Sequence, residues 1–518
     1  MSFLRRFLAF GAATMVSRVF GMGRDVLFAT SLGASALTDA FLVAFRLPNF
    51  FRRFFAEGAF SQSFVPVFVP MLSQDERRGM QFALSVGFFL SVIVGVIVVV
   101  LSLFADHWLG WLVPALTYQE STYLFAVDML RIMLPFLWCM ALVSWQVALL
   151  HAHQRFGLSA CLPIVMNLFM ILALSLGAWR AQGDHDTLVM LAWGVTLSGV
   201  AQVALASPFS YALWSAHKDG MAMPRWSQDI GAMLRLAVPS ALTACVHHVN
   251  VVMNTLLATL LPAGSVTMLY YADRVSQLPL GIIGVAASTV ILPSLASSHA
   301  SIERDGQGVQ HSNRQHDEAL HYSMLLAVPS AAGLFVLASP IIEMLFVYGD
   351  FTSQHGHVSA QCLQIFACGV PAFILSRLLV SFFYARKQHH YPLRSAMWSV
   401  VVNAFFAFML MHAYGIRGLA AAPVLASWFQ ALLLFWWLHG KGWFVFSRKV
   451  FSLFVMALSA SAVMVVCLLW FERLMLFERE AWFIRFAHVF LMVFVGVLCY
   501  GVVWWLQARI MLSDDRES

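Results

Sequence analysis

Apolar runs of about 20 residues, long enough to cross a bilayer as a helix, recur from the first residues of the chain almost to its last. Only helices and closed barrels can satisfy their backbone hydrogen bonds in lipid, and runs of this length are typical of helices. Composition agrees, since 61% of the residues are hydrophobic, 11% are charged and the mean hydropathy is +0.79. A soluble domain carries about 25% charged residues. The sequence therefore predicts an all-α integral membrane protein.

Polar breaks divide the sequence into about fourteen predicted spans. They lie near residues 9–33, 36–67, 80–104, 121–150, 158–179, 186–214, 229–262, 266–298, 317–341, 357–385, 391–413, 416–439, 449–471 and 482–508. The last two carry almost no internal charge, so they are expected either to face lipid or to form a groove for a long apolar tail.

Basic residues predict the orientation of these spans. The termini and alternate loops hold Arg5, Arg6, Arg77, Arg78, Arg155, Lys218, Arg225, Arg304, Arg314, Arg386, Lys387, Lys441, Arg448, Lys449, Arg509 and Arg516. The opposite loops hold only Arg180, Arg417, Arg473 and Arg479. Because cytoplasmic loops are enriched in Lys and Arg, both termini are expected in the cytoplasm. The net charge of +6 then reflects orientation, and nucleic-acid binding is not expected.

An internal repeat predicts two lobes. Ala44-Phe45-Arg46-Leu47 lies upstream of Pro66 with an Arg-to-Pro spacing of 20 residues, and Ala272-Asp273-Arg274-Val275 lies upstream of Pro293 with a spacing of 19. The two copies are six spans apart, which predicts two pseudo-symmetric six-helix lobes around a central cavity, a transporter architecture. The predicted divisions are an N-lobe at 1–220, a C-lobe at 221–440, and a helix pair with a cytoplasmic tail at 441–518.

Charged residues inside the first two spans depart from an ordinary membrane bundle. They are Arg18, Arg24, Asp25, Asp39, Arg46, Arg52, Arg53 and Glu57. A charge at mid-bilayer costs at least about 2.5–3.5 kcal/mol, so these groups are expected to face a polar cavity or one another. Gly21 and Gly23 would permit a bend between Arg18 and Arg24, and a kink or break is expected between Pro48 and Gly58.

Excess arginine in such a cavity favours a strongly anionic ligand, because guanidinium groups bind phosphate oxygens in pairs and keep their charge. A pyrophosphate fits this better than a cationic drug. Arg274 would bring a further cation from the second lobe. The alternative is that these arginines only join helices, with Arg24 paired to Asp25 or Asp39, Arg53 to Glu57, and Arg274 to Asp273. Asp128 and Arg131, three residues apart, are interpreted mainly as an ion pair.

The sequence contains little evidence for a metal site, a disulfide or a catalytic site. The closest histidine sets, such as His151-x-His153, have no carboxylate at ligand spacing, so no metal is expected. The seven cysteines lie in apolar segments without CxxC spacing, which argues against disulfides and zinc. The sequence contains no phosphate-binding glycine loop and no nucleophile elbow. An enzyme acting on lipid-linked sugars would need a catalytic carboxylate near a large loop, and the longest loops, near 298–316 and 105–120, are short.

Two segments resemble the signature of the MurJ/MviN family of lipid II flippases. One contains Ser17-Arg18-Val19-Phe20-Gly21, Arg24-Asp25, Thr38-Asp39-Ala40-Phe41, Phe45-Arg46-Leu47-Pro48-Asn49 and Arg52-Arg53-Phe54-Phe55-Ala56-Glu57-Gly58. The other contains Tyr270-Tyr271-Ala272-Asp273-Arg274 and Leu292-Pro293. The motif-level likeness is concentrated in residues 17–66 and 270–295.

The resemblance implies a multi-pass flippase of the bacterial inner membrane, in the multidrug/oligosaccharidyl-lipid/polysaccharide exporter superfamily. Its substrate would be lipid II for peptidoglycan synthesis and cell shape, moved by alternating access to the periplasmic leaflet. The substrate-binding arginines would be Arg18, Arg24, Arg52 and Arg274. Supporting or gating roles would fall to Asp25, Asp39, Arg46, Asn49, Arg53 and Glu57. Membrane lipids and the cell-wall synthesis and division machinery would be its partners.

No cofactor is expected, although transport would be coupled to the membrane potential or to a monovalent cation. Some family members hold sodium in the second lobe, where this chain offers Asn250, Asn254 and Asn403 but no interior Asp or Glu. Two other interpretations stay open: a related exporter, either a flippase for another polyprenyl-pyrophosphate-linked oligosaccharide or a cation-coupled drug exporter, and a membrane enzyme acting on lipid-linked sugars.

Overall fold

The computed structural model describes residues 3–56, 59–155, 157–180, 183–217, 223–281, 308–386, 388, 390–443, 448–474 and 482–517. Within these ranges every regular element is a helix, as the sequence predicts for an all-α membrane protein. Nine of the described helices are long and apolar enough to cross a membrane, and a bent helix pair would make a tenth. The count of about fourteen spans stays a prediction.

The chain forms two compact units. Unit 1 comprises Met1–Thr267 with Gly349–Phe351, and unit 2 comprises Met268–Tyr348 with Thr352–Ser518. These units are defined by packing, whereas the predicted lobes are defined by the repeat, so the lobe boundaries stay a prediction.

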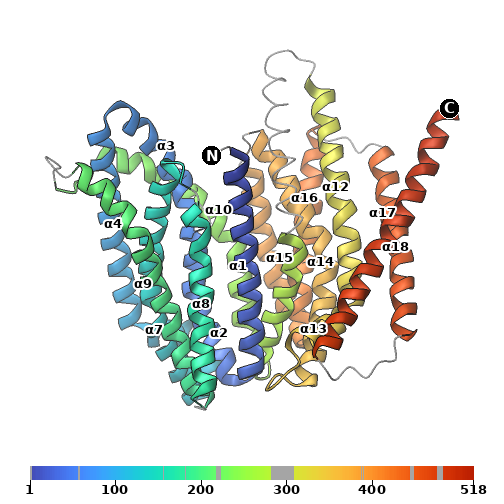
Figure 1. Ribbon diagram of the computed structural model, residues 1–518, viewed down its shortest axis with the longest axis horizontal. Coiled ribbons are helices and arrows are strands. Elements are labelled where there is room, and N and C mark those ends of the chain that lie inside the picture. Colours follow the sequence, from blue (N-terminus) through green and yellow to red (C-terminus); the bar gives the residue numbers. More distant parts are fainter. Residues whose placement is uncertain are drawn as a thin grey trace. The chain divides into compact units, whose positions relative to one another are not determined.

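Unit 1 is organised around helix α7, which packs most extensively against α2, α9, α4 and α3. Helix α8 lies between α1 and α9, and the three are seen side by side in Figure 1. The helices of this unit are α1 (Phe3–Leu32), α2 (Ala36–Ala56), α3 (Ala59–Gln74), α4 (Glu76–Leu103), α5 (Ala105–Leu112), α6 (Pro114–Thr117), α7 (Glu120–Ala152), α8 (Gly157–Trp179), α9 (Asp184–His217) and α10 (Gln228–Ala258).

Stacked phenylalanines form part of the core of unit 1. The ring of Phe64 lies between those of Phe60 and Phe68 along α3, at centroid distances of 5.6 and 5.0 Å, and also stacks on Phe82 of α4 at 5.8 Å. The first two pairs lie four residues apart, so successive rings fall on one face of the helix. This face joins α3 to α4, α7 and α10 in a single apolar cluster.

The predicted second span, 36–67, is divided between two helices. Helix α2 ends at Ala56 and α3 begins at Ala59, while Glu57 and Gly58 lie outside the described residues. Pro48 lies inside α2. The glycine end of the predicted kink therefore lies outside the described residues, and the kink stays a prediction there.

Unit 2 is organised around helix α14, which packs against α12, α13 and α16. Residues 268–281 continue the helix that begins at residue 265. The other helices are α12 (Gly308–Val336), α13 (Ala338–Phe346), α14 (Ser353–Ala385), α15 (His390–Tyr414), α16 (Ile416–Gly440), α17 (Arg448–Leu474) and α18 (Trp482–Glu517). The predicted span 317–341 is not a single straight helix, because α12 and α13 meet at an angle of 69°.

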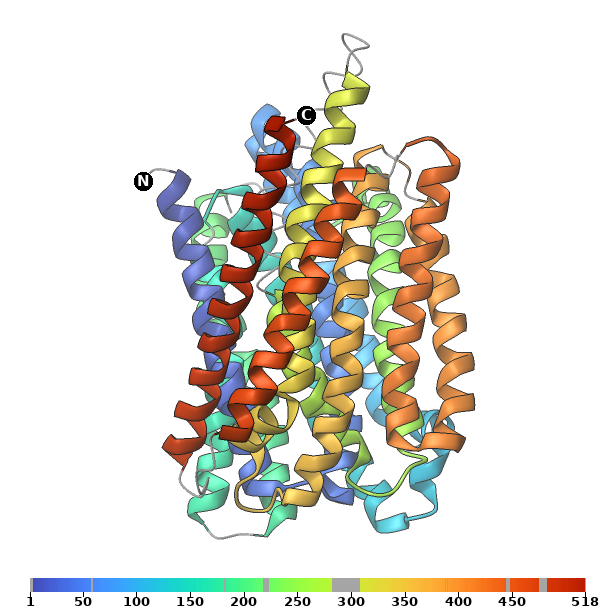
Figure 2. The ribbon, with the colours of Figure 1, turned by 90° about the vertical axis from the view of Figure 1, so that its right-hand side faces the viewer.

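Helices α17 and α18 form a pair at the end of the chain. Figure 2 shows them side by side, with α12 next to α17. Only 28% of the α17 span and 17% of the α18 span are buried, so most of their apolar surface is available to lipid. Arg485 of α18 donates to the carbonyl oxygens of Glu343 and Val347 at 3.4 and 3.1 Å. It thereby ties α18 to the C-terminal end of α13, where carbonyl groups have no partner within the helix.

Candidate functional site

Arg24 and Asp25 of α1 form a buried ion pair in unit 1. Each residue is only 4% exposed. The Nε and Nη2 atoms of Arg24 donate to one carboxylate oxygen of Asp25, at 3.0 and 2.6 Å. This is one of the two pairings expected for Arg24 if it joins helices, and the structure brings these two predicted site residues together.

Asn167 of α8 holds the other side of the same guanidinium group. Its amide oxygen accepts from Nη1 of Arg24 at 3.0 Å, and its amide nitrogen donates to the backbone oxygen of Ser17 at 3.1 Å. The sulfur of Met170 lies 3.6 Å from the same Nη1. A Cβ at Gly21 would lie 3.5 Å from Asn167 Nδ2, an ordinary van der Waals distance, so the amide lies beside this glycine. Asn167 therefore joins α8 to α1 through both a side chain and a backbone carbonyl.

This arrangement fixes a cation in a nearly dry setting. Removing a charge from water is costly unless the charge is paired and hydrogen-bonded, and Arg24 meets both conditions. A guanidinium fork that binds a carboxylate side-on can bind phosphate oxygens in the same way. Chemically, the cluster is a buried guanidinium group that binds one carboxylate and one amide oxygen.

The other predicted site residues of α1 and α2 lie at several separate places. Arg18 is exposed on α1, about 1.7 turns before the buried Arg24. Asn49 is buried in α2, and Arg46 lines a cavity of about 10 Å³ together with Trp108 and Thr255. For Arg52 and Arg53 the structure describes the helix but not the side chains. Glu57 lies outside the described residues.

Asp39 binds the start of a helix far along the chain. Its two carboxylate oxygens accept from the backbone N–H of Gly264 at 2.7 Å and from that of Thr267 at 2.9 Å, and the Thr267 hydroxyl donates at 2.6 Å. These amides lie at the N-terminus of helix 265–281, where backbone N–H groups have no partner within the helix. Asp39 thus acts as a helix cap supplied from another part of unit 1.

Arg274 lies on the same helix 265–281, in the part that belongs to unit 2. Its Nε and Nη2 atoms donate to the hydroxyl of Tyr270 at 3.1 and 3.0 Å, and its guanidinium carbon lies 5.0 Å from the ring centroid of Tyr270. Asp273, the partner proposed in the alternative interpretation, accepts from Gln277 at 2.7 Å. The half-buried Arg274 is therefore held by an aromatic neighbour one turn away.

Asn167 is a residue of this site that the sequence patterns do not predict. The signal was present, since a single amide in the apolar run after Pro163 needs a hydrogen-bond partner inside a membrane. The partner depends on how α1 packs against α8, and no sequence spacing shows that. The amides considered for sodium lie on two helices, Asn250 and Asn254 on α10 and the buried Asn403 on α15. Among the described residues no three His, Cys, Asp or Glu side chains gather as metal ligands do.

Comparison with known proteins identifies relatives across most of the chain. The probable lipid II flippase MurJ of Rhizobium meliloti (strain 1021) is 33% identical over 449 residues, covering 85% of this chain and 82% of the relative. The protein of the same description from Vibrio cholerae serotype O1 is 33% identical over 480 residues, covering 89% and 87%. The lipid II flippase MurJ of Burkholderia cenocepacia is 30% identical over 476 residues, covering 91% and 90%.

Solved structures share the fold. The inward-closed conformation of a lipid II flippase MurJ superposes with a TM-score of 0.80 at 23% identity, covering 98% of this chain and all of that one. An inward-facing multidrug transporter of the MATE family, in the MOP superfamily, gives 0.70 at 13% identity, covering 86% and 98%. The sequence model of the family described as lipid II flippase MurJ matches residues 28–493. The chain therefore belongs to the lipid II flippase MurJ family.

Proposed function

We propose that this chain is a lipid II flippase that moves the polyprenyl-pyrophosphate-linked peptidoglycan precursor from the cytoplasmic to the periplasmic leaflet. Membership of the MurJ family over residues 28–493 is the observation that carries this proposal. The family description names a transporter rather than an enzyme. The buried, hydrogen-bonded Arg24 supports the anionic substrate, since a drug exporter for cations would favour acidic groups there.

In the proposed mechanism the pyrophosphate of lipid II is bound by Arg18, Arg24, Arg52 and Arg274. Phosphate oxygens take the place of Asp25 on the Arg24 fork, because a pyrophosphate offers more negative charge and more acceptor atoms than one carboxylate. Asp39 and Asn49 act in support, as do Asp25, Arg46, Arg53 and Glu57, by positioning the arginines or gating the cavity. Neutralising the arginines then allows the two lobes to alternate their access.

We also propose that the protein lies in the bacterial inner membrane with both termini in the cytoplasm, as the bias of basic residues predicts. A fluorescent protein that matures only in the cytoplasm, fused after Ser518, is expected to fluoresce. A dark but full-length fusion would contradict the orientation. Delivery of the precursor to the cell-wall synthesis and division machinery belongs to the same proposal.

The test of the proposed function is the transbilayer movement of labelled lipid II in cells depleted of their own flippase. Wild type is expected to restore movement, whereas Arg24→Ala and Arg52→Ala, inserted at wild-type levels, are expected to fail. Arg78→Ala is a matched control, because Arg78 forms an exposed ion pair with Asp229 at 3.3 Å. Failure of a folded wild type would reject lipid II as substrate, and normal transport by both variants would reject the role of the arginines.

A further inference from the structure

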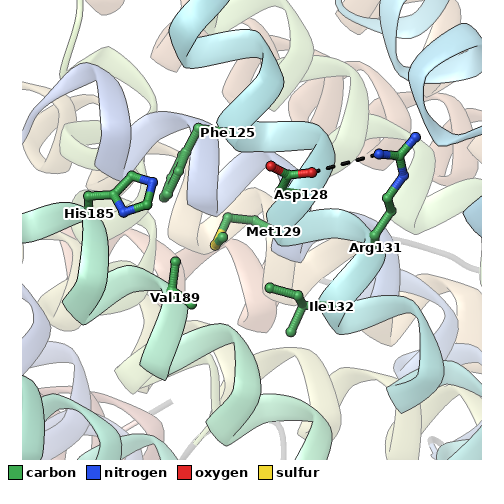
Figure 3. A pocket seen from close by; sticks show the side chains of 7 residues that line it. All are labelled: Phe125, Asp128, Met129, Arg131, Ile132, His185 and Val189. Atoms are coloured by element: carbon green, nitrogen blue, oxygen red, sulfur yellow. Dashed lines mark ion pairs between the residues drawn. The ribbon is translucent and has the colours of Figure 1, made fainter.

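A second charged site lies on unit 1, away from Arg24. Asp128 and Arg131 of α7, with His185 of α9, line a pocket of about 310 Å³ whose other lining residues are Phe125, Met129, Ile132 and Val189. Figure 3 shows the Asp128–Arg131 pair on the α7 side of this pocket and His185 on the α9 side. The walls between them are apolar, so the pocket presents opposite charges beside an apolar surface.

The pocket lies near the end of unit 1 where several helices begin or end. Arg131 donates through Nε to the carbonyl oxygen of Ser102 at 3.4 Å, one residue before α4 ends at Leu103. His185 lies in the first turn of α9, one residue after that helix begins. Ends of membrane-spanning helices are expected to lie near the boundary between the hydrocarbon and the aqueous phase.

Exposed aromatic side chains mark the same boundary. Trp179 at the end of α8, Trp111 in α5 and Tyr118 after α6 are 80%, 83% and 90% exposed. Tryptophan and tyrosine are enriched at the level of lipid headgroups, where an apolar ring and a polar group both find suitable surroundings. The pocket therefore opens at the depth of the headgroups of one leaflet.

The ion pair in this pocket is weak enough to be opened. Arg131 Nη1 and Asp128 Oδ1 are 3.7 Å apart, beyond hydrogen-bond distance, and the two side chains are 46% and 65% exposed. Half-exposed pairs of this kind contribute little to stability. Because Nε is held by Ser102, the guanidinium group stays in place when Asp128 turns to another cation.

We propose that this pocket binds the headgroup of a zwitterionic phospholipid with a primary ammonium group, as in phosphatidylethanolamine. Arg131 binds the phosphate, and Asp128 accepts hydrogen bonds from the ammonium group, so both charges of the protein and both charges of the lipid are paired. The start of an acyl chain lies against Phe125, Met129 and Ile132. A volume of about 310 Å³ suits a small headgroup and not a sugar–peptide headgroup such as that of lipid II.

The test measures lipid binding, so its outcome is independent of transport. Purified protein is delipidated in detergent, and lipid adducts are counted by native mass spectrometry after addition of phosphatidylethanolamine, phosphatidylcholine or phosphatidylglycerol at equal concentration. Wild type is expected to retain phosphatidylethanolamine at least tenfold better than the other two. Choline cannot donate hydrogen bonds to Asp128, and glycerol carries no positive charge for it.

Asp128→Asn and Arg131→Gln are each expected to abolish this preference. The double variant Arg78→Gln with Asp229→Asn removes an exposed ion pair of similar distance, 3.3 Å, at another place in unit 1, and is expected to keep the preference. Equal retention of all three lipids by wild type, or an unchanged preference in both pocket variants, would overturn the proposal. A preference for phosphatidylglycerol that only Arg131→Gln removes would also overturn it, because that result indicates a site for anionic lipid.

Discussion

At the scale of single residues, the buried Arg24 depends on its neighbours more than on its own position in the helix. Its guanidinium group is shared between a carboxylate on the same helix and an amide on α8. A buried ion pair is favourable only when its remaining hydrogen-bonding groups are also satisfied. Asn167 supplies one such hydrogen bond, and in the proposed mechanism the substrate anion takes the place of Asp25 on the other side of the guanidinium group.

Asn167→Leu is expected to lower both stability and transport. Leucine has a similar size but cannot accept from Arg24 or donate to Ser17. A hydrogen bond to a charged group contributes about 1.5–3 kcal/mol, so the melting temperature in detergent should fall, and lipid II movement should fall by about tenfold or more. Both quantities are measured on the purified protein, in a thermal melt and in proteoliposomes.

Two companion variants separate positioning from general instability. Asn167→Asp keeps the acceptor for Arg24 but adds a negative charge that competes with the substrate. Its main effect should therefore be a higher KM for lipid II, with only a small fall in the melting temperature. Ser144→Ala removes a buried hydroxyl that donates within its own helix, to the carbonyl oxygen of Ala141, and should change little. Wild-type KM in Asn167→Asp would contradict the positioning role.

At this scale the sequence identified the charges but only part of their partners. The cost of a charge in a membrane makes Arg24, Asp25 and Asp39 conspicuous in any apolar run. Neighbours in the chain, such as Asp25 beside Arg24, are visible because they are adjacent. The sequence does not show that Asn167 and Thr267 are such partners, because helix packing brings them to Arg24 and Asp39, which lie 143 and 228 residues away in the chain.

At the scale of helices, Asp39 does for helix 265–281 what a local cap does for other helices. In α4, Asp75 accepts from the amides of Arg77 and Arg78 at 3.0 and 3.1 Å, and it lies just before the helix it caps. Asp39 makes the same kind of contact across 225 residues of sequence. The position of the start of helix 265–281, which carries Arg274, is thereby tied to α2.

Asp39→Ala is expected to loosen the start of helix 265–281. Loss of a capping side chain costs about 0.5–2 kcal/mol, which should speed hydrogen exchange at the amides of Gly264 and Thr267 by several-fold or more. Mass-spectrometric hydrogen exchange on peptides that contain residues 264–267 measures this. Thr267→Val removes only the hydroxyl bond and should give a smaller change. Equal exchange in Asp39→Ala and wild type would show that the cap does not hold the helix.

Gly349→Ala is expected to destabilise the contact between residues 349–351 and the end of α1. Gly349 has φ of +56°, and a Cβ there would lie 2.2 Å from the backbone oxygen of Thr30, which also accepts from the amide of Asp350. Gly415 has the same φ but open space around its Cβ position, so Gly415→Ala isolates the cost of the backbone conformation, about 1–2 kcal/mol. A lower melting temperature for Gly349→Ala than for Gly415→Ala is expected, and equal values would contradict the steric explanation.

Hydropathy predicted most helices well because the bilayer imposes one length on all of them. It failed where helices join without a polar break. Residues 320–341 contain no Asp, Glu, Lys or Arg, yet they include the 69° bend between α12 and α13. A bend of this kind arises from packing, and an average over a long window cannot detect it.

At the scale of the whole molecule, the charge of the proposed cavity bears on the energy source. In the proposed cycle the empty cavity carries an excess of arginine charge, and a bound pyrophosphate neutralises it. Moving one elementary charge through 100 mV changes the free energy by about 2.3 kcal/mol. A potential that is negative inside therefore favours return of the empty, positive cavity toward the cytoplasm.

Collapsing the membrane potential is therefore expected to slow lipid II movement, by at most roughly 50-fold per charge at 100 mV. Proteoliposomes with potassium gradients and valinomycin set the potential, and movement of labelled lipid II is followed at zero and at 100 mV of either sign. Replacing sodium by choline at a fixed potential separates the electrical effect from coupling to a cation. A rate that is independent of potential would contradict this energy source.

The contacts of Asp39 also bear on how the protein is made. A chain growing on the ribosome contains Asp39 long before it contains Gly264 and Thr267, the partners of its carboxylate. At about 5–20 residues per second, roughly 10–50 s separate their synthesis. For that interval α2 enters the bilayer with an acidic group whose final partners do not yet exist, and the contact of Asp350 with Thr30 follows later still. Unit 1 is thus completed only after part of unit 2 has been inserted, and nascent chains that stop before residue 267 are expected to depend on insertion chaperones and to be degraded by membrane proteases.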